Sequence, residues 1–205
     1  MSAFLGPIHY WLHGKIMIQN DIVEEILKLA KEEYNIDYRQ DIDNEYGIIE
    51  LEPLEQVIDE SNIHGWLQER IHIVEKRLAY VVTNLIKDQG QSLEEIKKIY
   101  RQTGLAESEK SKLSRQATVS QIYKAAVNDS LIDGMPCDHV NAVKSQDDYE
   151  ITWKRTQCVH KEYWDDLGGD VSIYYDLRDE YIEGFLENFD VTYKKLDDST
   201  YKISK

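Results

Sequence analysis

Apolar residues recur at intervals of three and four between residues 61 and 89, the clearest pattern in the chain. The repeating positions are Ile63, Leu67, Ile71, Val74, Leu78, Val81, Val82 and Leu85. This spacing places them on one face of a long amphipathic helix. Ser61 or Asn62 precedes the first of them, so either polar side chain is expected to cap the helix start.

The segment before this helix has a weaker pattern. A short helix is expected to begin near Pro7 and end near Gly14, since proline suits a first turn and glycine a helix end. A second helix is predicted over residues 21–34, where apolar positions again share one face. Residues 35–60 are acidic and weakly periodic, which indicates a loop with a short helical turn after Pro53.

Two more helices are predicted after the long one. Ser92-Leu-Glu-Glu95 has the spacing of a capping box, which satisfies the free amides of a helix start. We expect this helix to run to about Thr103 and to stop at Gly104. A fifth helix is expected over residues 107–130, with Gly134 beyond its end.

The apolar period changes in the last third. Residues 149–154 alternate between apolar or aromatic and polar side chains, which predicts a strand. Helices are expected over residues 160–169 and 173–188. Residues 190–204 read as a β-hairpin with Asp197–Thr200 as its turn. The order of elements predicts an α+β fold, with an N-terminal helical bundle (1–135) followed by a small antiparallel sheet with helices (136–205), packed as one compact unit.

Charge and composition exclude several classes. Asp and Glu number 39 against 24 Lys and Arg, giving a net charge of −15, which disfavours binding to nucleic acid or an anionic membrane surface. Two cysteines cannot build a disulfide framework. The opening residues lack a basic stretch before the apolar part, and no apolar run approaches the roughly 18 residues of a membrane span. We therefore expect a cytoplasmic protein.

Both cysteines have a histidine two positions later: Cys137 with His139, and Cys158 with His160. Thiolate and imidazole are the ligands that zinc prefers, and two such pairs would complete a tetrahedron. The alternative is ordinary packing, because cysteine behaves as a small hydrophobe and is often buried.

The same cysteines are candidate nucleophiles. Cys137 lies in the expected turn after Gly134, and Cys158 precedes the helix expected at His160, whose dipole would favour a thiolate. In this hypothesis His139 and His160 act as acid or base.

A second possible metal set lies on helices. His9 and His13 are four residues apart and share a face, and His64 and Glu75 flank the apolar stripe of the long helix. Together they could hold iron, zinc or manganese inside a bundle. The competing interpretation is an aromatic packing layer with polar tips, made of His9, Tyr10, Trp11, His13 and Trp66.

The aromatic residues are mostly polar-edged, with fourteen Tyr and four Trp against three Phe. Such side chains suit a pocket for a small polar molecule and a dimer interface equally well, so a homodimer stays open. No phosphate loop, dinucleotide fingerprint, Gly-x-Ser-x-Gly elbow or HExxH motif occurs, which argues against those chemistries.

The stretch from LIDGMPCDHV through YEITWKRTQCVHKEYWDDLGGD to the final hairpin resembles the L-2-amino-thiazoline-4-carboxylic acid hydrolase-like family. The resemblance implies a helical front, a cysteine-containing α+β end and hydrolysis of a small ring that contains sulfur and nitrogen, with Cys158 and Cys137 as the positions to suspect. The last segment, YKKLDDSTYKISK, departs from the family pattern because it has no cysteine. The opening FLGPIHYWLHGKI is similar to uncharacterised proteins of anaerobic bacteria, which implies no function.

Three functional hypotheses follow. The first is a cytosolic protein that binds a small polar molecule and hydrolyses a C–N or C–S bond. The second is a non-catalytic protein holding Zn or Fe through the Cys and His residues named above. The third is an acidic helical module that binds another protein.

Overall fold

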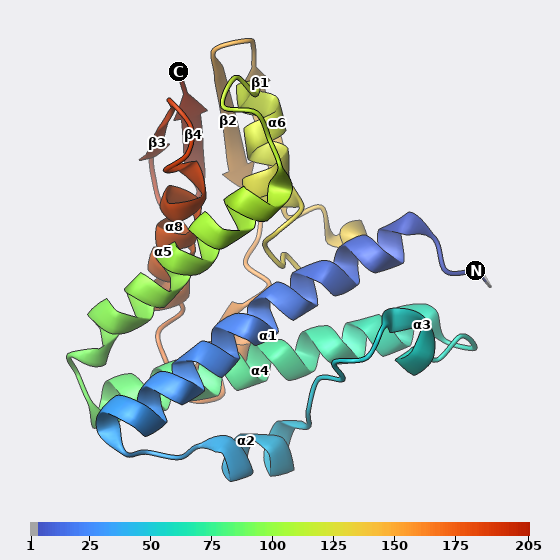
Figure 1. Ribbon diagram of the computed structural model, residues 1–205, viewed down its shortest axis with the longest axis vertical. Coiled ribbons are helices and arrows are strands. Elements are labelled where there is room, and N and C mark those ends of the chain that lie inside the picture. The colour runs from blue at the N-terminus through green and yellow to red at the C-terminus, as the bar shows by residue number, and fades with distance from the viewer. Residues whose placement is uncertain (1–3) are drawn as a thin grey trace.

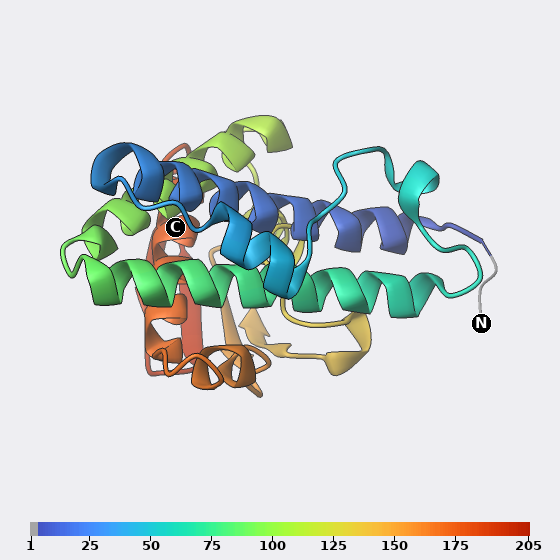
Figure 2. The same ribbon diagram turned by 90° about the horizontal axis from the view of Figure 1, so that it is seen from below.

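Two long helices, α1 (Pro7–Tyr34) and α4 (Ile63–Asp88), form one layer of the computed structural model, which describes residues 4–205. They lie side by side and run in the same direction (Figure 1). Figure 2 shows that the connection between them crosses back along the pair, carrying α2 (Arg39–Tyr46) and α3 (Leu54–Val57). The predicted cap of α4 is confirmed at Asn62, whose Oδ1 accepts a hydrogen bond from the Gly65 amide at 3.2 Å.

A second helical pair, α5 (Ser92–Ser111) and α8 (Val171–Leu186), packs along its length (Figure 1). Glycines allow the two backbones to approach closely. A Cβ added at Gly104 of α5 would overlap the carbonyl oxygen of Tyr181, and one added at Gly184 of α8 would overlap the carbonyl oxygen of Arg101. The pairing therefore joins the N-terminal helices to the C-terminal segment.

Within residues 4–205 the strands form one four-stranded antiparallel sheet, in the order β1-β2-β4-β3. The strands are β1 (Asn141–Gln146), β2 (Glu150–Arg155), β3 (Thr192–Lys195) and β4 (Thr200–Ser204). Trp153 of β2 is buried on the covered face, with its ring centroid 5.6 Å from that of Tyr201. The short helix α6 (Val119–Tyr123) packs on this face through Tyr123, whose ring centroid is 4.8 Å from that of Trp153.

Three further short elements border the site described below. They are the π-helical turn η1 (Lys124–Asn128), the 3-10 turn η2 (Pro136–Asp138) and the helix α7 (Lys161–Asp165). The predicted fold class is confirmed, because helices dominate and the sheet is small and antiparallel. One hydrophobic core includes residues from both sides of position 135. No helix in residues 4–205 is long and apolar enough to cross a membrane.

The prediction that a helix ends near Gly14 is wrong, because α1 continues to Tyr34. Gly14 is exposed and a side chain there would meet nothing within 4 Å, so it costs about 1 kcal/mol in helix propensity and nothing in packing. The buried residues Leu12 and Ile16 continue the apolar face across it. Burial of this apolar face outweighs the weak tendency of Gly14 to end the helix.

The predicted stop at Gly104 is also wrong, because α5 continues to Ser111. The lack of a side chain at Gly104 lets α5 pack closely against α8. The predicted capping box is not formed: Ser92 is the first helical residue, and the N-cap position is occupied by Gln91 without a side-chain cap hydrogen bond. Short elements with weak patterns, α2 and β1, were not predicted.

Candidate functional site

A buried ion pair connects α4 to the start of α7. His160 Nδ1 lies 3.0 Å from Glu75 Oε2, and each side chain is only 1% exposed. Glu75 belongs to the apolar flank of α4, which turns its carboxylate into the protein. His160 is the N-cap residue of α7, directly after the segment that leaves β2. The pair thus joins two parts of the chain that are distant in sequence.

A second buried pair lies beside the first. The Arg178 guanidinium donates two hydrogen bonds to the Asp133 carboxylate, at 2.8 Å to Oδ1 and 2.7 Å to Oδ2. Asn141 Nδ2 donates to the same Oδ2 at 2.6 Å. His160 Nε2 lies 3.8 Å from Asp133 Oδ1, beyond hydrogen-bonding distance but close enough for electrostatic attraction. The four ionisable side chains therefore lie in the order Glu75, His160, Asp133 and Arg178.

The neighbouring charges set the protonation states of His160 and Asp133. Burial alone would lower the pKa of His160, but the negative charges of Glu75 and Asp133 raise it to about 9. Burial would raise the pKa of Asp133, but the Arg178 guanidinium holds it well below its usual range. His160 is consequently a cation at neutral pH, with a proton on both ring nitrogens.

A cavity of about 120 Å³ borders the first pair and is called the His160 cavity here. Its lining includes Gln68, Ile71, Glu75, Gly134, His160 and Tyr163. Glu75 Oε1 and His160 Nε2 have no hydrogen-bond partner within residues 4–205. Tyr100 Oη is also buried without a partner there, and burial followed by the charge of Glu75 raises the pKa of this tyrosine. Several buried polar atoms that could still form hydrogen bonds therefore lie around Glu75.

A second cavity, of about 140 Å³, lies on the Asp133 side and is called the Lys15 cavity. Lys15, Trp11, Asn128, Asp133, His139 and Asn141 are among its lining residues. Gly134 borders both cavities and adopts a φ of +70°. Asp138 fixes this turn by accepting a hydrogen bond from the Met135 amide at 2.7 Å.

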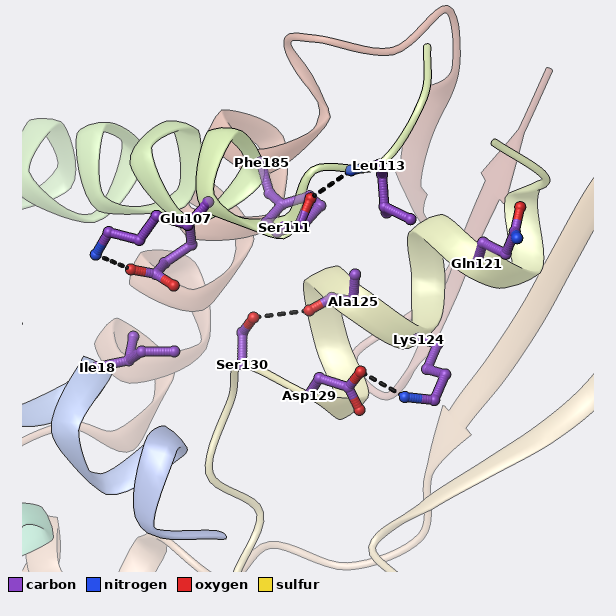
Figure 3. A pocket seen from close by; sticks show the side chains of 11 residues that line it. Ile18, Glu107, Ser111, Leu113, Gln121, Lys124, Ala125, Asp129, Ser130 and Phe185 are labelled. Carbon is purple, nitrogen blue, oxygen red and sulfur yellow. Dashed lines mark hydrogen bonds and ion pairs between the residues drawn. The ribbon is translucent and has the colours of Figure 1, made fainter. Parts of the chain in front are cut away.

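A larger hollow of about 400 Å³ lies between α1, α5, η1 and α8, but most of its polar groups pair with one another (Figure 3). Lys124 pairs with Asp129 at 2.5 Å, and Ser130 donates to the Ala125 carbonyl at 2.7 Å. None of the residues lining it is among those with a buried, unpartnered side-chain atom in residues 4–205. Size alone therefore does not make it the better polar site.

The structure separates the four residues of the Cys-x-His prediction. Cys137 is exposed, while Cys158 is half-buried and its Sγ accepts a hydrogen bond from Tyr175 Oη at 3.0 Å. His160 is occupied by Glu75, and His139 lines the other cavity at the surface. Nowhere in residues 4–205 do three or more His, Cys, Asp or Glu side chains gather so that they could hold a metal ion. The structure therefore does not bring the four residues of the predicted zinc set together.

The helical metal set is separated too. The rings of His9 and His64 approach to 5.5 Å between centroids, but His9 Nδ1 accepts a hydrogen bond from the Gly6 amide at 2.9 Å. His13 packs beside Trp66 instead, with ring centroids 6.3 Å apart. Glu75 binds His160 rather than any of these histidines. These four side chains are therefore not gathered as a metal-ligating group, and the three histidines form aromatic contacts instead.

Sequence reasoning found Glu75 and His160 but assigned them to different sites. It missed Asp133, Arg178 and Lys15 altogether. Asp133 stands before Gly134 in an Asp-Gly turn, which reads as a loop signal, and Arg178 and Lys15 read as ordinary solvent-facing positions of helices. Their positions along the helices could have identified Arg178 and Lys15. Both fall on the buried face of their helix, where a charge needs a partner.

Comparison with models of protein families, with curated proteins and with solved structures finds no match to this chain.

Proposed function

We propose that the protein binds a small polar molecule of the cytoplasm in the His160 cavity. The observation that carries the proposal is a buried pair of opposite charges in which each partner keeps one unpaired polar atom within residues 4–205, Glu75 Oε1 and His160 Nε2. An unsatisfied buried polar group costs about 1–3 kcal/mol, and more when charged. A ligand that pairs with these atoms recovers that free energy on binding.

The two atoms define the chemistry of the ligand. Glu75 Oε1 accepts hydrogen bonds, and the protonated His160 donates one from Nε2. A carboxamide or a similar group offers a matching N–H donor and C=O acceptor. The volume of about 120 Å³ restricts the ligand to a few non-hydrogen atoms.

Acetamide is a suitable probe for this site. We expect it to shift the ¹⁵N resonances of His160 in histidine-labelled protein, with saturable binding. Glu75→Gln should abolish the saturable shift, while Glu69→Gln, at an exposed position of the same helix, should leave it unchanged. If His160 responds to neither acetamide nor urea at millimolar concentration, the proposal fails.

Hydrolysis of a C–N or C–S bond is the second candidate, and one observation favours it. Tyr175 Oη donates a hydrogen bond to Cys158 Sγ at 3.0 Å, which stabilises negative charge on that sulfur. The Arg155 guanidinium lies 3.8 Å from the centroid of the same tyrosine ring. In this candidate Cys158 is the nucleophile, and His160 acts as an acid or a fixed positive charge because it is already protonated.

The named probe for hydrolysis is 2-amino-thiazoline-4-carboxylic acid, which follows from the family resemblance. Ring opening, observed by proton NMR, should disappear in Cys158→Ser and persist in Cys137→Ser. Equal turnover in both variants removes Cys158 as the nucleophile. Acetamide binding at His160 is a separate measurement, so failure of hydrolysis leaves the binding proposal to be judged by its own result.

A further inference from the structure

Lys15 is an unusual lysine, because its side chain lies inside the fold and borders a cavity. It is 4% exposed, on the face of α1 that packs inward. The Lys15 cavity is also lined by His139, which is exposed, so the cavity connects the surface to the buried amine. A small molecule in this cavity would therefore lie beside the Lys15 side chain.

The amine is held by an aromatic ring rather than by a carboxylate. Lys15 Nζ lies 4.0 Å from the ring centroid of Trp11. Trp11 is itself fixed by its Nε1, which donates to Asp129 Oδ1 at 3.0 Å. Within residues 4–205 Lys15 forms no ion pair, and Asp133 is already bound by Arg178. The amine is thus positioned without an ion pair that would keep it protonated.

Burial makes this amine available as a nucleophile. Burial lowers the pKa of Lys15 to about 8, with the negative charge of Asp133 opposing this effect and the positive charge of Arg178 adding to it. At pH 7 about a tenth of Lys15 is then neutral, compared with well under a thousandth of an ordinary lysine. Only the neutral amine can attack an electrophilic carbon.

We propose that Lys15 forms an imine with a small polar carbonyl compound that enters the Lys15 cavity. Nζ attacks the carbonyl carbon and forms a C–N bond. The carbonyl oxygen then leaves as water, taking up the two protons that the amine loses, and a C=N bond remains. No oxidant or reductant is needed.

The lining defines the class of carbonyl compound. Asn128 and Asn141 offer amide groups at the cavity, and Asn128 is placed by the π-helical turn η1, which directs the chain from the sheet-covering helix into this loop. A volume of about 140 Å³ admits an aldehyde or keto acid of a few non-hydrogen atoms and rejects a bulky aromatic aldehyde. This cavity adjoins the His160 cavity at Gly134, but imine formation at Lys15 requires no ligand at His160.

The test uses glyoxylate as the probe, with cyanoborohydride present to reduce any imine to a stable secondary amine. Peptide mapping by mass spectrometry then gives the modification rate of each lysine between pH 6 and 9. At pH 7 we expect Lys15 to react at least about tenfold faster than the exposed Lys31 and Lys110, owing to its larger neutral fraction. Lys15 reacting no faster than these lysines overturns the proposal.

Two controls separate a built site from exposure through unfolding. Lys15→Arg should remove the fast phase, whereas Lys31→Arg should retain it. Pyridoxal, which is too large for the cavity, should label Lys15 at least about tenfold more slowly than glyoxylate does, relative to Lys31. If both aldehydes label Lys15 with the same preference, the amine is reached by opening of the fold and the proposal is wrong. This comparison uses the unaltered chain, so it does not depend on how well Lys15→Arg folds.

Discussion

Glu75 on α4 and His160 at the start of α7 are joined by a 3.0 Å hydrogen bond between two side chains that are each 1% exposed. A buried charge pair of this kind stabilises the fold only while both partners stay charged. His160 also lies 3.8 Å from Asp133, so loss of its proton would leave two carboxylates near one neutral ring. The pair should therefore couple folding to pH.

The direction of this coupling follows from the pKa of His160, which is about 9 in the folded protein and ordinarily 6.5. A raised pKa contributes stability that is fully present below pH 6.5 and is lost as the pH rises through 9. We expect the free energy of unfolding of the wild type, relative to His160→Gln, to fall by on the order of 3 kcal/mol across this window. Urea unfolding between pH 6 and 10 measures it. His64→Gln, at an exposed histidine, should show no such difference, and a flat profile for the wild type relative to His160→Gln would contradict the assignment.

Replacement by alanine should have opposite effects at Gly104, in the α5–α8 contact, and at Gly14, on the exposed face of α1. Gly104→Ala should destabilise the protein by roughly 1–3 kcal/mol, because its Cβ would overlap the carbonyl oxygen of Tyr181. Gly14→Ala should stabilise it by about 1 kcal/mol, because a Cβ there meets nothing within 4 Å and alanine favours the helix. Thermal and urea unfolding distinguish the two. Equal effects at both positions would show that the helices are not in this close contact.

The glycines also show why the sequence predicted some of the fold and not the rest. A long repeat at three and four residues identified α4, and strict alternation identified β2, because each pattern is set by burial of one face. A glycine in a helix has two opposite meanings, however. It ends a helix where the chain must turn, and it continues one where another backbone approaches. Only the partner helix decides between them.

The sequence was limited in the same way for the candidate site, because it did not show which side chains meet in space. Glu75 and His160 were chosen by residue type, and their spacing in the chain said nothing about their contact. Lys15 and Arg178 were invisible because basic residues on helices are usually exposed. Metal ligation was predicted from residue types and their spacing in the chain, whereas ligation depends on convergence in three dimensions. Burial of a charge, which the structure provides, was the more informative signal.

The two thiols should differ in reactivity. Cys137 is exposed in η2, whereas Cys158 is half-buried and hydrogen-bonded by Tyr175 at 3.0 Å. Titration with a coloured disulfide reagent should therefore show one fast and one slow phase of equal size. Cys137→Ser should remove the fast phase, and Tyr175→Phe should change only the slow one. Two fast phases would mean that Cys158 is more accessible than its contacts indicate.

Arg178 should be intolerant even of lysine. Its guanidinium makes two parallel hydrogen bonds to Asp133, at 2.8 and 2.7 Å, in a site where both side chains are largely buried. Lysine is a single point charge and cannot reproduce this geometry, so Arg178→Lys leaves the Asp133 carboxylate incompletely paired. Breaking a buried pair costs on the order of 3–5 kcal/mol, and we expect Arg178→Lys to lose part of this, about 2 kcal/mol or more, in urea unfolding at pH 7.

Arg101 provides the matched control for this substitution. Its guanidinium pairs with Glu183 at 2.8 Å and with Glu187 at 2.7 Å, but its side chain is 42% exposed. Ion pairs in contact with solvent contribute about 0–1 kcal/mol, so Arg101→Lys should change the free energy of unfolding by less than about 1 kcal/mol. A cost at Arg101 equal to that at Arg178 would mean that burial does not distinguish the two sites. A larger loss of stability in Arg178→Lys than in Arg101→Lys would show that the bidentate bond to Asp133 stabilises the buried charge cluster beside His160.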